Sequence, residues 1–346
     1  MKKIDITALA RDNVKKLQPY SSARDDFQGT ASLFLDANEN PFESGFNRYP
    51  DPHQKELKQV IATLRGVSPD QLFLGNGSDE AIDLLFRTFC EPGRDAVLIP
   101  QPTYGMYAVS AATNDIKINS VLLTPDFQLD TQGVLQAVTP STRIIFLCSP
   151  NNPSGNLLRI QDIEHLLSEV NCLVVVDEAY IDFTDQPSWS QRLPEFENLI
   201  VLQTLSKAWG LAGLRIGICI AHPEIIALLN KIKPPYNINS FTQAEALRRL
   251  TENSAATIEQ VNLLRQQRMQ LSESLKRLKS VRKVFPSDAN FILVQIDNAT
   301  DVYHKLVSKG TVVRNRSGVV RCADCLRITI GTPAENRLLI EQLSNL

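Results

Sequence analysis

The chain has 346 residues, of which 43% are hydrophobic and 21% charged, with a formal net charge of −2 at pH 7. This length predicts two domains, and the near-neutral charge without a dense run of lysine or arginine argues against a nucleic-acid-binding surface. No apolar run approaches the ~18 residues that a membrane span needs, and residues 1–5 carry charges where a signal peptide would need an apolar core, so we expect a cytoplasmic protein.

The first predicted functional element is the glycine-rich turn at residues 74–80, Leu-Gly-Asn-Gly-Ser-Asp-Glu. Apolar residues recur at helical spacing from Ala81 to Phe89, so the turn opens a helix. Backbone amides at such a helix start are free, and they suit an anion such as a phosphate ester. Asp79 and Glu80 could instead serve only to complement the helix dipole.

Two further turns follow predicted strands. Tyr104 comes after the strand at 97–99, and its ring could stack on a planar ligand, although tyrosines at helix starts also serve in simple packing. The turn at 149–155 follows the apolar run at 143–148. An asparagine of this turn could donate a hydrogen bond to a phenolate oxygen without adding a competing base, while the same residue types punctuate ordinary loops.

The run from Cys172 to Asp177 is predicted to be a parallel strand buried on both faces, because it is apolar and β-branched. Strands of open α/β sheets point their carboxyl ends at the ligand crevice, so Asp177 would lie at the mouth of a site with Tyr180 on the next loop. A buried aspartate beside the ring nitrogen of pyridoxal phosphate keeps that nitrogen protonated. The alternative interpretation of Asp177 is a helix cap or turn residue.

Residues 204–215, Thr-Leu-Ser-Lys-Ala-Trp-Gly-Leu-Ala-Gly-Leu-Arg, predict a cofactor anchor. Lys207 lies between two hydroxyl residues and small residues, and Arg215 follows eight positions later. A lysine that forms a Schiff base with an aldehyde cofactor needs a tight backbone turn and a nearby cation for the cofactor's phosphate. The alternative is an ordinary solvated lysine.

Strands and amphipathic stretches alternate through the middle of the chain, which predicts a large α/β domain with a mostly parallel sheet over residues 46–235. The predicted strands are 97–99, 116–122, 143–148, 172–177, 199–204 and 216–220. Pro234 and Pro235 stop the preceding helix and mark the domain boundary.

A smaller α+β domain is predicted over residues 236–346. It would contain a long helix at 241–278 and a strand at 291–296. Residues 1–45 are predicted to form an N-terminal arm that packs with this smaller domain.

The six cysteines do not indicate a metal site. Four of them lie in apolar surroundings, as buried free thiols do. Cys322 and Cys325 form a lone CxxC pair, and the four histidines are scattered without ligand spacing, so a zinc site lacks its second ligand pair.

In the order glycine turn, aromatic residue, asparagine turn, aspartate with tyrosine, and lysine with arginine, these segments resemble the fold type I pyridoxal-phosphate aminotransferases. Within that superfamily the chain is most similar to the histidinol-phosphate aminotransferases of the class-II branch, over nearly its whole length. The segments that carry this closer resemblance are residues 9–24, 35–41, 48–51 and 326–332. The resemblance implies a large domain, whose mostly parallel sheet is flanked by helices, plus a smaller α+β domain.

The resemblance also implies a role for each cofactor-binding residue. Lys207 would carry the Schiff base, Asp177 would hold the ring nitrogen, and Tyr104 would stack on the ring. Asn152 and Tyr180 would bind the phenolate oxygen. The phosphate would lie among Gly77, Ser78, Asp79, Thr204, Ser206, Arg215 and, from a second copy of the chain, Tyr49. That last contact requires a homodimer.

For the substrate, the resemblance implies Arg314 and Arg327 as cations for its phosphate, or for the carboxylates of glutamate and 2-oxoglutarate. A planar guanidinium binds either anion through paired donors. Tyr20 would be a further contact, and Asn38 and Glu39 would lie close to the substrate.

The choice of Arg314 stays open at this point. Counting back from Arg327 selects it only if no insertion intervenes. Arg316 and Arg321 are the neighbouring alternatives, and both could instead be solvated surface charges.

The implied activity is ping-pong transamination, in which L-histidinol phosphate and 2-oxoglutarate give imidazole acetol phosphate and glutamate in L-histidine biosynthesis. The implied cofactor is pyridoxal 5′-phosphate, and no metal is expected. An aromatic amino acid aminotransferase and a phosphate-recognising decarboxylase of the same branch would share every cofactor residue, so both stay as alternatives. A non-catalytic pyridoxal-phosphate-binding module is an alternative from another class, and Lys207 together with Asp177 counts against it.

Overall fold

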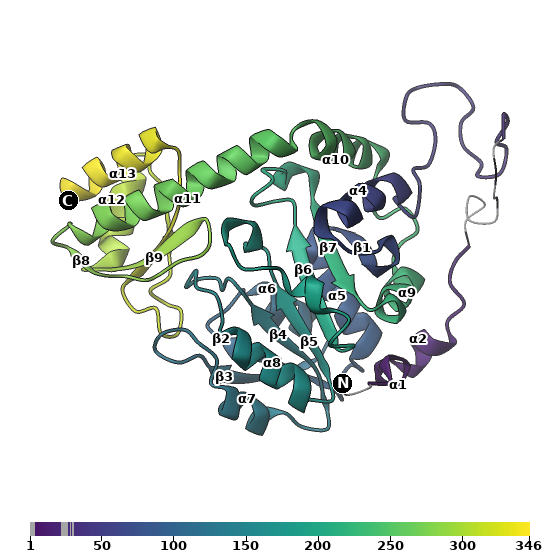
Figure 1. Cartoon of the computed structure of the whole chain (residues 1–346), viewed down its shortest axis with the longest axis horizontal. Helices are drawn as coiled ribbons and strands as arrows, with labels where there is room; N and C mark the ends of the chain where they lie inside the picture. The colour runs from purple at the N-terminus through teal and green to yellow at the C-terminus, as the bar shows by residue number, and fades with distance from the viewer. Residues whose placement is uncertain (1–3, 22–26, 28, 30) are drawn as a thin grey trace.

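The computed structural model describes residues 4–21, 27, 29 and 31–346, so Ser22 to Arg24 of the N-terminal resembling segment lie outside the described residues. Two sheets organise the described chain (Figure 1). The larger sheet has the strand order β1-β7-β6-β5-β4-β2-β3. Its strands are β1 (Leu72–Asn76), β2 (Ala96–Gln101), β3 (Lys117–Leu122), β4 (Thr142–Cys148), β5 (Leu173–Asp177), β6 (Leu199–Thr204) and β7 (Ile216–Ala221). Only the pairs that β7 makes are antiparallel, so the prediction of a mostly parallel sheet is confirmed.

Strand β1 was not predicted, because its glycine and asparagine are typical of a turn. It forms by pairing with β7, which sets Gly75 opposite Gly217. A Cβ atom at Gly217 would overlap the backbone of Gly77 and Ser78, so only glycine permits this close approach of β7 to the helix start. The approach brings the residues before β7 next to the glycine-rich turn.

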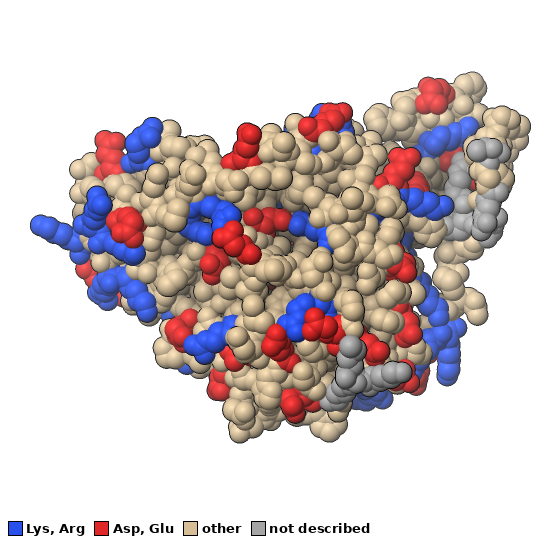
Figure 2. Space-filling model, in the orientation of Figure 1, with Lys and Arg blue, Asp and Glu red and all other residues tan. Residues whose placement is uncertain are grey.

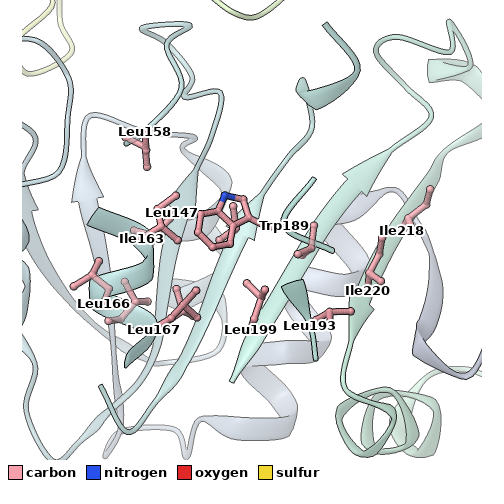
Figure 3. Close-up of a cluster of buried hydrophobic side chains, with 14 of the residues drawn as sticks. Leu147, Leu158, Ile163, Leu166, Leu167, Trp189, Leu193, Leu199, Ile218 and Ile220 are labelled. Carbon is pink, nitrogen blue, oxygen red and sulfur yellow. The ribbon is translucent and has the colours of Figure 1, made fainter. Parts of the chain in front are cut away.

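Helices cover both faces of the larger sheet. On one face lie α5 (Ser78–Phe89), α6 (Met106–Thr113) and α9 (Pro223–Ile232), and on the other α4 (Lys55–Arg65), α7 (Thr131–Ala137), α8 (Ile160–Glu169) and α10 (Ser240–Glu252). Each face has its own apolar core, named here the α5 core and the α8 core after one helix on that face. Side chains along a strand alternate between faces, so Val175 of β5 is buried in the α5 core, whereas Val174 and Val176 are buried in the α8 core. Figure 3 shows Trp189 and Leu193 packed in the α8 core beside Leu199.

The smaller sheet has the order β10-β11-β9-β8, and all its pairs are antiparallel. Its strands are β8 (Val281–Val284), β9 (Phe291–Ile296), β10 (Arg314–Asn315) and β11 (Cys325–Thr329), and its helices are α11 (Ser254–Lys276), α12 (Ala299–Ser308) and α13 (Pro333–Ser344). The single helix expected at 241–278 is two helices, α10 and α11, which break at Asn253, a residue type that favours helix caps. Helix α11 runs from α10 toward the smaller sheet (Figure 1).

The N-terminal arm was expected to pack with the smaller domain, and the structure differs. Helices α1 (Ile6–Leu9) and α2 (Asp12–Lys16) contact α9, which covers the larger sheet. Ile6 is buried in the α5 core, where its apolar surface leaves water. Arg11 pairs with Glu91 at 3.1 Å. Residues 31–49 extend outward from the body (Figure 1).

Candidate active site

A cavity of about 390 Å³ opens where three strands of the larger sheet end. Cys148 ends β4, Asp177 ends β5 and Thr204 ends β6, and all three line the cavity. The other lining residues are Gly77, Ser78, Asp79, Tyr104, Asn152, Ala179, Tyr180, Ser206, Lys207, Ala212, Arg215, Arg314, Arg316 and Arg327. Figure 2 shows a hollow near the centre of the viewed face, with both signs of charge around it.

Asp177 is buried and receives two hydrogen bonds. The Tyr107 hydroxyl donates to its Oδ2 at 2.6 Å, and the backbone N–H of Ala179 donates to its Oδ1 at 3.0 Å. Burial raises the pKa of Asp177 to about 6, against the lowering effect of these donors. A cation beside this carboxylate would lower the pKa of Asp177 again and keep the group charged. A protonated pyridine nitrogen needs such a charged carboxylate as its partner.

Tyr107 is a site residue that the sequence reasoning missed. Its ring is fully buried between Tyr104 and Phe146. Tyr107 lies in the first turn of α6, and the available signal was a second tyrosine three residues after Tyr104, close behind the same predicted strand.

Lys207 lies on the cavity wall, with its Nζ atom 5.9 Å from the centre of the Tyr180 ring. The surrounding protein displaces water from the amine and lowers the pKa of Lys207, and the Arg327 charge adds to the lowering. The tight turn predicted here exists: Gly210 has a φ of +65° and donates its N–H to the Lys207 carbonyl.

The start of α5 forms an anion cradle with the segment before β7. The Gly77 N–H donates to the Arg215 carbonyl at 2.6 Å, and Gly77 has a φ of +79°. A Cβ atom there would overlap the Arg215 guanidinium, so glycine keeps the cradle open. The cation is balanced by Asp79, 3.7 Å away, and Asp79 accepts a hydrogen bond from Tyr104. Free amides at the start of a twelve-residue helix, together with Arg215, fit a phosphate group.

A third group joins the two sheets. Asn152 donates from Nδ2 to the Tyr180 hydroxyl at 3.4 Å and accepts from Nη1 of Arg327 at 2.6 Å. Burial raises the pKa of Tyr180 and, at the same wall, lowers the pKa of Arg327. Tyr180 therefore keeps its proton at neutral pH.

Four predicted site residues do not line the cavity of their own chain: Tyr20, Asn38, Glu39 and Tyr49. Glu39 accepts instead from Arg48 at 2.6 Å and from the N–H of Tyr49 at 2.7 Å. Tyr49 stacks on Tyr236 with 4.4 Å between ring centres and is 51% exposed. Asn38, Glu39 and Tyr49 belong to the outward segment 31–49, and Tyr20 precedes that segment in the chain.

The structure brings two of the three alternative arginines to the cavity. Arg314 and Arg316 line it, and Arg321, which lies exposed in the loop before β11, does not. Cys322 and Cys325 are buried free thiols. Within the part of the chain that the structure describes, no three His, Cys, Asp or Glu side chains gather as metal ligands would, and no helix combines the length and apolarity needed to cross a bilayer.

Comparisons with known proteins agree with this geometry. The family model for class I and II aminotransferases matches residues 33–343. The chain is 51% identical to a histidinol-phosphate aminotransferase of Christiangramia forsetii, covering 100% of this chain and 99% of the relative. It is 53% identical to that of Parabacteroides distasonis, over 99% of both chains. The crystal structure of a histidinol-phosphate aminotransferase from Sinorhizobium meliloti in complex with pyridoxal-5′-phosphate has a TM-score of 0.79 and 25% identity, covering 86% of this chain and 82% of that one.

Proposed function

The chain belongs to the class I and II aminotransferases, among the histidinol-phosphate aminotransferases, and we propose that it moves the amino group of L-histidinol phosphate to 2-oxoglutarate. The products are imidazole acetol phosphate and glutamate, in L-histidine biosynthesis. The observation that carries this proposal is one cavity that joins Lys207 and Asp177 to arginines from the smaller sheet. A cytoplasmic location is part of the proposal, because the six cysteines are free thiols, as is usual in a reducing compartment.

Pyridoxal 5′-phosphate is the cofactor, and the residues present fit it. The cavity offers a buried carboxylate for a ring nitrogen, a phenol and an amide for a phenolate oxygen, an amine for an aldehyde, and the cradle at Gly77 for a phosphate. When bound, the cofactor supplies an aldehyde that bonds reversibly to amines and a ring that stabilises negative charge at the substrate's α carbon.

Asp177 and Lys207 would do the acid–base work. The carboxylate of Asp177, already oriented by Tyr107 and Ala179, would hold a proton on the ring nitrogen. Lys207 would first hold the aldehyde carbon and then, as a free amine, take the proton from the substrate's α carbon. Its lowered pKa favours the neutral amine that this transfer needs.

The remaining cofactor contacts would fix position. Tyr180 keeps its proton and would donate it to the phenolate oxygen, assisted by Nδ2 of Asn152. Tyr104 would stack on the ring. The phosphate would be held by Gly77, Ser78, Asp79, Thr204, Ser206 and Arg215, all of which line the cavity.

The substrate's anionic end would meet Arg327 and Arg314, which lie opposite each other on β11 and β10. One set of guanidinium donors could serve phosphate in one half-reaction and carboxylate in the other. Tyr20, Asn38 and Glu39 are proposed near the substrate on the arm that approaches from a partner.

We propose that the protein is a homodimer, because residues of the N-terminal segment are proposed to serve the site of a second copy of the chain. The outward segment 31–49 exposes large apolar side chains: the exposed fractions are 79% for Leu35, 80% for Phe42 and 74% for Phe46. Apolar surface gathered on one extended segment is typical of a protein interface. A second copy of the chain would cover it, and Tyr49 would then reach the phosphate cradle of that copy.

The test is a single-turnover absorbance measurement. L-histidinol phosphate and L-phenylalanine are added to separate samples of cofactor-loaded protein, and the loss of the bound-aldehyde band is followed. Fast conversion by histidinol phosphate and slow conversion by phenylalanine would support the proposal. The reverse order would identify an aromatic amino acid aminotransferase. L-Histidinol phosphate has no carboxylate, so a third sample receives O-phospho-L-threonine, and release of carbon dioxide there would identify a decarboxylase.

A further inference from the structure

Three arginines share one face of the hairpin formed by β10 and β11. Arg314 and Arg327 are direct partners across the antiparallel pair, so their side chains lie on the same face. Arg316 comes two residues after Arg314, and its N–H donates to the Cys325 carbonyl at 2.8 Å, which extends the pairing by one step. Side chains two residues apart in extended backbone point the same way, and all three arginines line the cavity.

The positive charge on this face has no carboxylate to balance it. None of the ion pairs among the described residues involves Arg314, Arg316 or Arg327. The carboxylates in the cavity are engaged elsewhere, Asp79 beside Arg215 and Asp177 with Tyr107. Three neighbouring guanidinium groups without a counter-charge are most readily explained by an anionic ligand of more than one charge.

Arg316 itself has an unmet donor. Its Nε atom is shielded from solvent and has no hydrogen-bond partner. Partial burial lowers the pKa of Arg316, and the charges of Arg327 and Arg314 add to the lowering. A solvated surface arginine would show neither feature. A shielded cationic donor is costly unless a ligand satisfies it.

We propose that Arg316 is a specificity-determining residue, which completes with Arg314 and Arg327 a subsite for the dianionic phosphate of a phosphomonoester substrate. This rests on the proposed function. A carboxylate carries one charge and two oxygens, and two guanidinium groups satisfy it, whereas a phosphate dianion offers three oxygens to three cations. Arg316 would therefore favour the phosphorylated substrate and contribute little to the binding of glutamate.

The experiment compares Arg316→Gln with wild type in single turnovers of cofactor-loaded protein. The substrates are L-histidinol phosphate, L-histidinol, which lacks the phosphate, and L-glutamate. We expect the ratio of rate to half-saturation for histidinol phosphate to fall about 10- to 100-fold, as loss of a charged hydrogen bond does. The values for histidinol and glutamate should change less than about threefold. Arg321→Gln, five residues away and outside the cavity, is the matched control and should change none of them.

Equal losses for all three substrates, or no loss for any, would overturn the assignment. Thermal melting distinguishes a folding defect of Arg316→Gln from a loss of substrate binding. If Arg316→Gln does not fold, Arg316→Lys is the second variant, because it keeps the charge and loses only the paired donors. Inorganic phosphate titrated into the cofactor-loaded protein gives a readout without turnover, and its affinity should fall about tenfold or more in Arg316→Gln. If wild type converts glutamate and not histidinol phosphate, the proposed function fails, while the phosphate titration still decides the role of Arg316.

Discussion

Nη1 of Arg327 donates a hydrogen bond of 2.6 Å to Oδ1 of Asn152, 175 residues away in sequence. Arginine can only donate, so Oδ1 must accept and Nδ2 of the same amide faces Tyr180 as a donor. One residue of the smaller sheet thereby sets the orientation of an amide on the larger sheet. The proposed substrate contact at Arg327 and the proposed cofactor contact at Asn152 are therefore joined by one hydrogen bond.

Replacing Asp177 with Asn should stabilise the cofactor-free protein and weaken cofactor binding. The pKa of Asp177 is about 6 in the fold and 3.8 as the ordinary value. The folded state therefore keeps the proton longer than the unfolded state, and stability falls as pH rises from about 4 to 6. Asp177→Asn removes this loss. The free energy of unfolding of the variant should therefore exceed that of wild type by nearly zero below pH 4 and by about 3 kcal/mol above pH 6. Melting curves from pH 4 to 8 measure it, with the exposed Asp70→Asn as control.

Removing the Tyr107 hydroxyl should reduce cofactor affinity while the fold survives. Tyr107→Phe keeps the buried ring between Tyr104 and Phe146 and deletes only the donor to Asp177. The hydrogen bond favours the charged carboxylate, so its loss should raise the pKa of Asp177 further. We expect about tenfold weaker binding in a cofactor titration. Unchanged affinity, as expected of the control Tyr303→Phe, would contradict this role.

A side chain at Gly77 should damage the phosphate cradle. Gly77 combines a φ of +79° with a space that the Arg215 guanidinium occupies. Gly77→Ala should cost about 1–3 kcal/mol of stability from backbone strain, and it should weaken the cofactor by displacing Arg215. Gly318→Ala is the control, because a Cβ atom there meets nothing within 4 Å. Equal melting temperatures and affinities for the two variants would exclude a cradle at this position.

The homodimer predicts complementation between two inactive chains. Lys207→Ala lacks the amine, and Tyr49→Ala lacks the contact proposed to cross the interface. In a mixed dimer, intact Lys207 of one chain meets intact Tyr49 of the other, so one of the two sites is restored. Half of randomly mixed dimers are of this kind, so we expect about a quarter of wild-type activity. If Tyr49 acts within its own chain, mixing restores nothing.

The sequence alone determined the strands and the turns that carry chemistry. Buried parallel strands are apolar over their whole length, as at 172–177, and glycine or asparagine turns at their ends have few conformations to choose from. The sequence alone therefore placed Asn152, Asp177 and Lys207 near the same edge of the predicted sheet. The family resemblance supplied a role for each of them.

Only the tertiary structure decided which distant residues meet. Strand β1 exists because β7 pairs with it, the N-terminal helices lie on α9 because Ile6 finds an apolar core there, and Tyr107 reaches Asp177 across 70 residues. The hairpin register brings Arg316 to the cavity and leaves Arg321 outside. Local patterns encode how each segment folds, whereas register and packing between segments depend on surfaces that form only when both are in place.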